Sequence, residues 1–340
     1  MSCVWWPAVQ LFPKRKHLPN FFPLDMPDIK IYVALYLKKA FQGIIMHFYR
    51  NWFLASRPWS FSMTAISISV GGALAAIYGS FSWFLYLLTL AGTILLHAAT
   101  NLINDYYDVK SGVDTQEVAT AQYRPHPLVE GKLEARHVRT ATYILYALST
   151  LIGFYLVATR GWELLWIGLI GTFASLTYTA PPLKYKYSAL GEISVFLMWG
   201  PLMVAGSFFV QRQEFSLNAF WISLPFGVLV ALVLLANNIR DIAHDRNKGI
   251  LTLAIVLGKH KSILLYGTLV VVAYLGIILM SIFGPLYLWS LIVLASLPLA
   301  LRLLKQMKTH VPADADARTA QLDTAFGLLL VISLVLAGVF

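Results

Sequence analysis

Residues 82–103 read SWFLYLLTLAGTILLHAATNLI, and the residues that follow, 104–114, read NDYYDVKSGVD. The first stretch carries no charged side chain, and about 20 apolar residues are enough for a helix to cross the hydrocarbon core of a bilayer. The second stretch places Asp105, Asp108 and Asp114 directly after it. The sequence therefore predicts a transmembrane helix that ends, at one membrane surface, in a cluster of carboxylates.

Similar apolar runs recur along the chain. Hydrophobic residues make up 58% of the sequence, charged residues only 12%, and mean hydropathy is +0.68, all outside the usual balance of a soluble domain. We expect an all-α, polytopic transmembrane helical bundle of about nine spans within a single membrane domain, residues 51–340. The predicted spans are 59–79, 82–103, 138–158, 163–180, 190–210, 219–237, 262–283, 286–303 and 324–340.

The basic residues indicate how this bundle is oriented. Lys and Arg accumulate in the short cytoplasmic connections of membrane proteins. With these spans, all of the 26 basic residues except Arg160 and Arg212 fall on one side, together with the N-terminus. The N-terminus and the loops that carry the acidic clusters are therefore expected to be cytoplasmic. The net charge of +10 does not point to nucleic acid, because the basic residues form short clusters between apolar runs.

Residues 1–50 form a separate N-terminal extension. The basic cluster Lys14-Arg15-Lys16 follows the apolar start, and no small-residue cleavage site is present, which excludes a secretory signal peptide. The stretch from 30 to 50 is compatible with an interfacial amphipathic helix. The alternative is an over-long start, with Met26 or Met46 as the true beginning. Cys3, the single cysteine, can form no internal disulfide.

A second acidic cluster ends the sixth predicted span. Residues 237–249 read NNIRDIAHDRNKG, so Asp241 and Asp245 are four residues apart. Asn104 and Asp108 have the same spacing in the first cluster, and residues four apart share one face of a helix. The span count places both clusters at the same bilayer surface.

Carboxylates at a membrane boundary indicate a functional site unless they are paired. Mg²⁺ prefers oxygen ligands and is often held by one or two carboxylates together with substrate phosphate oxygens. Two acidic clusters facing each other could hold such ions around a diphosphate. The alternative for a single cluster is helix caps or solvated loop residues, but two clusters at equivalent helix ends favour the metal site.

Several basic residues reach the same predicted surface. Each of them, taken singly, is compatible with a simple orientation charge. Arg124 lies in the loop after the first cluster, and Lys184 follows Tyr178, where a phenol and an ammonium could meet a phosphate. His97 lies two helical turns before Asn104, so it either lines a cavity or is a buried, hydrogen-bonded histidine. The remaining basic candidates are Arg57 and Lys110.

These motifs resemble those of a known family. Asn104-Asp105-Tyr-Tyr-Asp108 and Asn238-Ile-Arg240-Asp241-x-x-x-Asp245 resemble the paired aspartate motifs of the UbiA-type intramembrane prenyltransferases, and the likeness runs from about residue 57 to the end. Within this family, the chain is most similar to the 1,4-dihydroxy-2-naphthoate prenyltransferases of menaquinone synthesis. Three stretches carry this similarity: the first motif with its Lys-Ser-Gly-Val-Asp-Thr continuation, Arg124-Pro-His-Pro-Leu-Val-Glu-Gly131, and the second motif through Thr252-Leu-Ala.

The resemblance implies a bundle around a central cavity and an enzyme that transfers a polyprenyl group from a polyprenyl diphosphate to an aromatic quinone precursor in the bilayer. It also implies a bacterial cytoplasmic membrane. The implied Mg²⁺ ligands are Asp105, Asp108, Asp241 and Asp245, assisted by Asn104, and the four aspartates are the candidate catalytic residues. The expected substrate-binding residues are Asn104, Lys110, Arg124, Tyr178, Lys184, Asn238, Arg240 and Arg57.

One position departs from the pattern of that branch. The branch has Gly-Lys-x-Thr-Leu-Ala after the second motif, whereas this chain has Gly249-Ile250-Leu-Thr252-Leu-Ala. Other acceptors therefore remain alternatives, namely 4-hydroxybenzoate, homogentisate, a glycerol-phosphate lipid or a chlorophyllide. A polytopic transporter is the other alternative, although transporters bind their substrates near the midplane rather than at one surface.

Overall fold

The computed structural model describes residues 46, 48–79, 81–116 and 123–339. The chain divides into two units, Met1–Tyr49 and Arg50–Phe340. The helix expected over residues 30–50 lies almost entirely outside the described residues, and so does the alternative of a later start. The remainder of the fold concerns the second unit.

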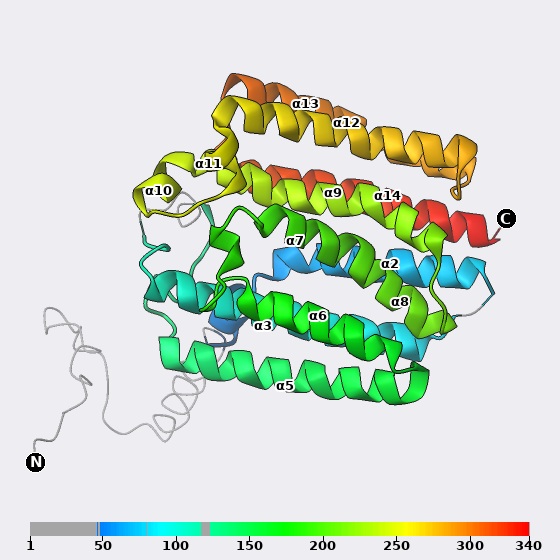
Figure 1. The fold of residues 1–340 in the computed structure, drawn as a ribbon, viewed down its shortest axis with the longest axis horizontal. Helices are drawn as coiled ribbons and strands as arrows, with labels where there is room; N and C mark the ends of the chain where they lie inside the picture. The colour runs from blue at the N-terminus through cyan, green and yellow to red at the C-terminus, as the bar shows by residue number, and fades with distance from the viewer. Residues whose placement is uncertain (1–45, 47, 80, 117–122, 340) are drawn as a thin grey trace, which may run out of the picture. The chain divides into compact units, whose positions relative to one another are not determined.

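The second unit is built from helices (Figure 1). A 3₁₀ turn, η1, covers Pro58–Ser60, and a π-helical turn, η3, joins α7 to α8 over Met198–Leu202. Two further 3₁₀ segments are η2 (Tyr185–Tyr187) and η4 (Leu288–Ser296). The α-helices are α2 (Phe61–Ile77), α3 (Trp83–Lys110), α5 (Ala135–Arg160), α6 (Glu163–Thr177), α7 (Gly191–Leu197), α8 (Met203–Arg212), α9 (Leu217–Arg240), α10 (Ile242–Asn247), α11 (Leu253–Leu257), α12 (Lys259–Phe283), α13 (Leu297–Thr309) and α14 (Ala315–Val339).

The predicted all-α membrane bundle is confirmed. Among the described residues, eight helical stretches are long and apolar enough to cross a bilayer. The remaining predicted span, 163–180, coincides with α6, which is apolar but only 15 residues long. Pro181-Pro182 follows soon after its end, and proline cannot continue a helix because it lacks the backbone donor. The last span begins earlier than hydropathy suggested, since α14 already starts at Ala315.

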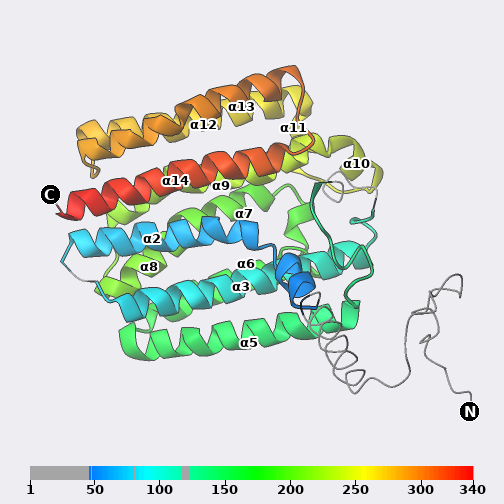
Figure 2. The ribbon, with the colours of Figure 1, turned by 180° about the vertical axis from the view of Figure 1, so that it is seen from behind.

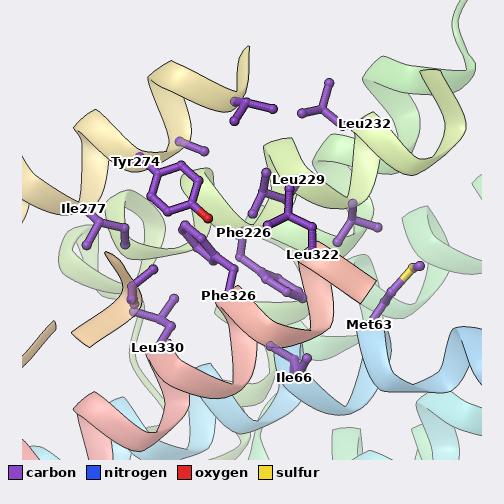
Figure 3. Packing of buried hydrophobic residues seen from close by; sticks show 14 of the residues in the cluster. Met63, Ile66, Phe226, Leu229, Leu232, Tyr274, Ile277, Leu322, Phe326 and Leu330 are labelled. Atoms are coloured by element: carbon purple, nitrogen blue, oxygen red, sulfur yellow. The ribbon is translucent and has the colours of Figure 1, made fainter. Parts of the chain in front are cut away.

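The largest core cluster lies between α2, α9, α12 and α14 (Figure 3). Phe226 of α9, Phe326 of α14 and Ile66 of α2 point toward one another there, and the ring of Tyr274 packs at 5.3 Å on that of Phe326. A Cβ atom added to Gly327 would lie 2.5 Å from Phe226 and 2.6 Å from Ile66. The close approach of α14 to both neighbours therefore requires glycine at this position.

The C-terminal ends of α3 and α9 lie at the same end of the bundle, beside α10 and α11 (Figure 2). Both acidic motifs are therefore brought together in space, although more than 100 residues separate them along the chain. We call this end of the unit the motif end.

Candidate active site

The first motif is shaped by the way α3 ends. Ser82 caps the start of this helix, and Gly112, with a φ of 71°, turns the chain back after its last residue. Only glycine adopts this left-handed conformation readily. The turn lets the backbone N–H groups of Val113 and Asp114 donate to the carbonyl of Asp108 at 2.8 and 3.2 Å. Asp114 is thereby folded back toward the aspartates of the helix.

Asp105 and Asp108 are buried, each with 2% of its surface exposed, and each is held by cations from other segments. The guanidinium of Arg57 donates to Asp105. Lys186 Nζ lies 2.7 Å from the Asp108 carboxylate, which also accepts from the hydroxyl of Tyr187. Buried carboxylates are stable only when they are compensated in this way, so the first motif is fully paired.

Asp114 and His126 complete a compact acidic group with Asp105. One ligand atom from each of the three lies within 4.8 Å of the other two, an arrangement that could hold a metal ion. His126 Nε2 is 3.2 Å from Asp114 and 3.7 Å from Asp105. Burial alone would raise the pKa of Asp114, but the hydrogen bond with His126 and the positive charges of Lys186 and Arg57 lower it. Asp114 is therefore a carboxylate anion at neutral pH.

The second motif lies at the end of α9 and in α10. The guanidinium of Arg240 makes two hydrogen bonds to Asp241, at 2.8 and 2.6 Å, and a third to Asp316 of α14 at 2.6 Å. The amide of Asn238 donates to Glu192 at 2.9 Å. Burial and the neighbouring charge of Asp241 raise the pKa of Asp245 to about 6, so its carboxyl retains a proton more readily than an ordinary aspartate.

One cavity of about 830 Å³ connects the two motifs. Its wall is polar at the motif end and becomes largely apolar along α5, α6 and α8. Of the residues predicted for the site, those that line it are Arg57, Asn104, Asp108, Arg124, Tyr178, Asn238, Asp241 and Asp245. Asp105 and Arg240 do not line it themselves but bind Arg57 and Asp241, which do.

Two predicted basic residues lie away from the cavity wall. The ammonium of Lys110 lies over the ring of Tyr106, 5.7 Å from its centroid. Lys184 has a left-handed backbone with a φ of 43° and opens the 3₁₀ turn η2, and that turn places the next lysine, Lys186, on Asp108. Lys186 was not among the residues predicted for the site. The Tyr-Lys-Tyr sequence at 185–187 is the one local signal that could have marked it.

Four further residues of the site were not among the predicted ones. His126 and Tyr187 contact the aspartates directly, and Asp114 joins them through His126. His244 lines the cavity and lies with its Nε2 3.2 Å from the carbonyl of Val113, so it links the two motifs. Asp114 and His126 both belong to the motifs quoted above, but only the fold shows that they meet.

A polytopic helical bundle with two acidic helix ends at one largely apolar cavity suits an intramembrane enzyme that acts on a lipid with a charged head group. The chain matches the model of the UbiA prenyltransferase family over residues 64–337. It therefore belongs to the UbiA prenyltransferase family and is an integral membrane prenyltransferase.

Individual relatives cover most of the chain. It is 31% identical to 1,4-dihydroxy-2-naphthoate octaprenyltransferase of Bacillus subtilis (strain 168), over 83% of this chain and 91% of that protein. It is 33% identical to UbiA prenyltransferase domain-containing protein 1 of Xenopus tropicalis, over 84% and 81%. A UbiA homolog from Archaeoglobus fulgidus, bound to DMAPP and Mg²⁺, shares the fold with a TM-score of 0.55 at 15% identity, over 83% of this chain and 99% of that one.

Proposed function

We propose that this prenyltransferase moves a polyprenyl group from a polyprenyl diphosphate to 1,4-dihydroxy-2-naphthoate, giving the prenylated naphthalenediol that is the reduced form of demethylmenaquinone. The observation that carries the proposal is one continuous cavity, which has the carboxylates of both motifs at one end and a long apolar wall beyond them. A diphosphate with an apolar tail has the same division into a charged and an apolar part. The Bacillus subtilis relative supports this acceptor.

The side chains at the motif end suit Mg²⁺. Asp108, Asp241, Asp245 and Asn104 line the cavity and carry oxygen donors, and Asp105 lies directly behind Arg57. Oxygen donors are the ligands that Mg²⁺ prefers, and it commonly completes its shell with phosphate oxygens and water. The Mg²⁺ and DMAPP bound by the Archaeoglobus fulgidus homolog agree with this choice. Bound there, the ion would draw electron density from the diphosphate and so weaken the allylic carbon–oxygen bond.

The basic residues of the site would bind the diphosphate itself. Arg57 and Lys186 are paired with carboxylates that a metal ion would engage, so their N–H groups become available to phosphate oxygens when donor and ion bind together. Burial and the nearby positive charge of Arg57 lower the pKa of Arg124, which stacks over Trp59 at 5.8 Å. The positive charges of Arg57 and Arg124 repel each other, and a phosphate anion bound between them would offset this repulsion. It would also accept charge-assisted hydrogen bonds, which are strong.

The apolar part of the cavity has two roles in this proposal. It holds the polyprenyl tail, and it keeps water from the reacting carbon, because water would trap an allylic cation as an alcohol. The acceptor ring enters the same space, and one of its ring carbons forms the new bond. Ile250, where the naphthoate branch carries lysine, is buried in the cavity wall, so the other aromatic acceptors remain the second candidates.

We also infer that residues 51–340 carry the whole activity and that residues 1–50 are an accessory extension. The bundle would lie in a bacterial cytoplasmic membrane with the motif end facing the cytoplasm, as the distribution of its basic residues favours. Proteolysis of sealed vesicles from both directions would test this orientation at the connection between α3 and α5.

The proposed function is tested with membranes that contain the full chain. They are incubated with labelled polyprenyl diphosphates and a panel of aromatic acceptors, with Mg²⁺ or with excess chelator. The expected result is a prenylated naphthalenediol, detected as the naphthoquinone after oxidation in air, that forms only with Mg²⁺. A product from a different acceptor would replace the naphthoate assignment, and substrate counterflow without any prenylated product would refute the enzyme reading altogether.

A further inference from the structure

The helix that runs from α7 to α8 is interrupted where it passes the cavity. The π-helical turn η3 contains Pro201, and π-helical turns occur frequently at functional sites. Gly200 within it lies against α9, since a Cβ atom there would be 3.1 Å from the Cα of Gly227. The carbonyl of Trp199 accepts a hydrogen bond of 2.6 Å from Ser67 of α2. The backbone of the turn is therefore held from two sides.

This turn presents the side chain of Trp199 to the cavity. Its indole N–H donates to the hydroxyl of Thr64 at 3.2 Å. The ring lies edge-to-face with His97, with 5.1 Å between centroids and 75° between planes. The ring is thus fixed by its N–H group and by its contact with His97, and it forms part of the cavity wall.

A directed chain of hydrogen bonds holds the Trp199 ring. The hydroxyl of Ser60 donates to the carbonyl of Arg57 at 2.7 Å, so its oxygen is left to accept from His97 Nε2 at 3.2 Å. These partners assign the His97 proton to Nε2, and Nδ1 then accepts from the hydroxyl of Thr64 at 2.8 Å. The Thr64 oxygen in turn accepts from the indole. The chain runs from Trp199 back to Arg57, whose side chain binds Asp105.

The depth of Trp199 suits the reacting part of a donor. His97 lies seven residues before Asn104 on α3, which is about 10 Å along the helix axis. The ring that packs on His97 is therefore below the carboxylates but close enough to face the first isoprene unit of a donor whose diphosphate is held among them. The hydroxyls of Ser60 and Thr64 and the imidazole of His97 are already bonded to one another, which leaves the indole ring as the group of this cluster best suited to meet a cation in the cavity.

We propose that Trp199 is a catalytic residue whose indole face stabilises the allylic cation formed from the donor. The inference rests on the proposed prenyl transfer. In that step the C1–O bond breaks and its electron pair leaves with the diphosphate, while a pair from the acceptor ring carbon forms the new bond to C1. The ring then expels its carboxylate as carbon dioxide and recovers its aromatic electrons. Trp199 forms no bond, and Thr64, His97 and Ser60 are positioning residues that keep its face toward C1.

The test replaces every tryptophan of the full chain with mono-, di- and trifluorinated analogues. Fluorine withdraws electron density from the π face with little change in shape, so each added fluorine weakens a cation–π contact. Single-turnover rates are measured with donor, acceptor and Mg²⁺, and donor affinity is measured separately with an unreactive thiodiphosphate. The logarithm of the rate should fall steadily with fluorine number, while the affinity stays constant.

Two variants assign this effect to one of the ten tryptophans. In Trp199→Phe the rate should no longer depend on fluorination, whereas Trp221→Phe, a change on the exposed surface of α9, should keep the full dependence. Trp199→Leu should lower the single-turnover rate about 30-fold, as expected from a desolvated cation–π contact. The single-turnover rate of Thr64→Val should lie between those of the wild type and Trp199→Leu. This variant should also release more prenyl alcohol, because the indole ring is no longer held by the Thr64 hydroxyl.

A fluorination effect that persists unchanged in Trp199→Phe would overturn the inference, and so would a wild-type rate that does not respond to fluorine. Because fluorination retains the shape of the side chain, this result does not depend on whether Trp199→Leu folds. A wild-type protein that transfers no prenyl group to any acceptor would refute the proposed function and this inference with it. The two failures are therefore distinguishable.

Discussion

The two acidic motifs share a four-residue spacing but lie in different electrostatic surroundings. In the first, Asp105 and Asp108 are neutralised by Arg57 and Lys186, which come from distant segments. In the second, Asp241 is bound by its own neighbour Arg240, and no ion pair to Asp245 is found within the described part of the chain. Similar sequence patterns thus produce one motif that is already paired and one whose last carboxyl is held partly protonated.

This difference suggests that the two motifs have different roles in the proposed reaction. With metal ions bound, the carboxylates of the paired motif would hold the metal, and Arg57 and Lys186 would be available to bind the phosphate oxygens. The second motif has no such cation to release at Asp245, so it acts mainly through its oxygen atoms. Each prediction below changes one side of this comparison.

The largest effect is expected when either motif loses an aspartate of the cavity wall. Asp108→Asn and Asp241→Asn should each lower prenyl transfer roughly 1,000-fold, because several kcal/mol of charge stabilisation by the metal would be lost. Activity is measured in detergent-solubilised protein whose elution from a sizing column matches wild type. Asp314→Asn, a half-exposed carboxylate paired with Arg318, is the matched control. Near-normal activity in both motif variants would contradict the metal site.

A smaller effect is expected when the cation of the first motif is removed. Lys186→Met should raise the KM for the polyprenyl diphosphate about 30-fold, because a charge-assisted contact to phosphate contributes about 2 kcal/mol. Lys184→Met removes the same charge two residues earlier, outside the cavity wall, and should change the KM little. Equal effects of the two substitutions would show that only the overall positive charge of this surface matters.

These two lysines also show where sequence reasoning stops. The periodic placement of apolar runs and the four-residue spacing within each motif were enough to predict the helices and to bring the carboxylates to one end. Whether Lys184 or Lys186 reaches Asp108 depends on the left-handed backbone at residue 184 and on the 3₁₀ turn after it. That register is fixed by tertiary packing, so a sequence pattern could not choose between them.

The ends of the helices show a similar limit. The last span was predicted to begin at residue 324, because Asp316 and Asp323 lower the hydropathy before it, yet α14 includes both. Asp316 is accommodated there by Arg240 and by the hydroxyl of Tyr123, which lies 2.5 Å from it. The apolar run alone does not show that Arg240 and Tyr123 are close to Asp316. These partners from other segments stabilise the first turn of α14, so the start of the helix could not be predicted from hydropathy.

The raised pKa of Asp245 predicts a pH dependence for the second motif. Because its carboxyl has a pKa of about 6 in the metal-free protein, protons compete with metal at this position below that pH. Binding of Mn²⁺, followed by electron paramagnetic resonance as a probe for Mg²⁺, should weaken about tenfold between pH 7 and pH 5. In Asp245→Asn the affinity should be lower at pH 7 but should change less on acidification. An equal loss in the variant would assign the titration to another group.

The smallest effect is expected when a cation is added to the cavity wall after the second motif, which has fewer cations from distant segments than the first. Ile250 lies in the cavity wall and is 9% exposed, at the position where the naphthoate branch carries lysine. Ile250→Lys should lower the KM for a carboxylated acceptor about fivefold, since a partly solvated ion pair contributes about 1 kcal/mol. Ile250→Met has a similar length without the charge and should leave this KM unchanged. If lysine and methionine act alike, residue 250 selects the acceptor by shape, and the wild-type isoleucine is then compatible with the same acceptor as its lysine-bearing relatives.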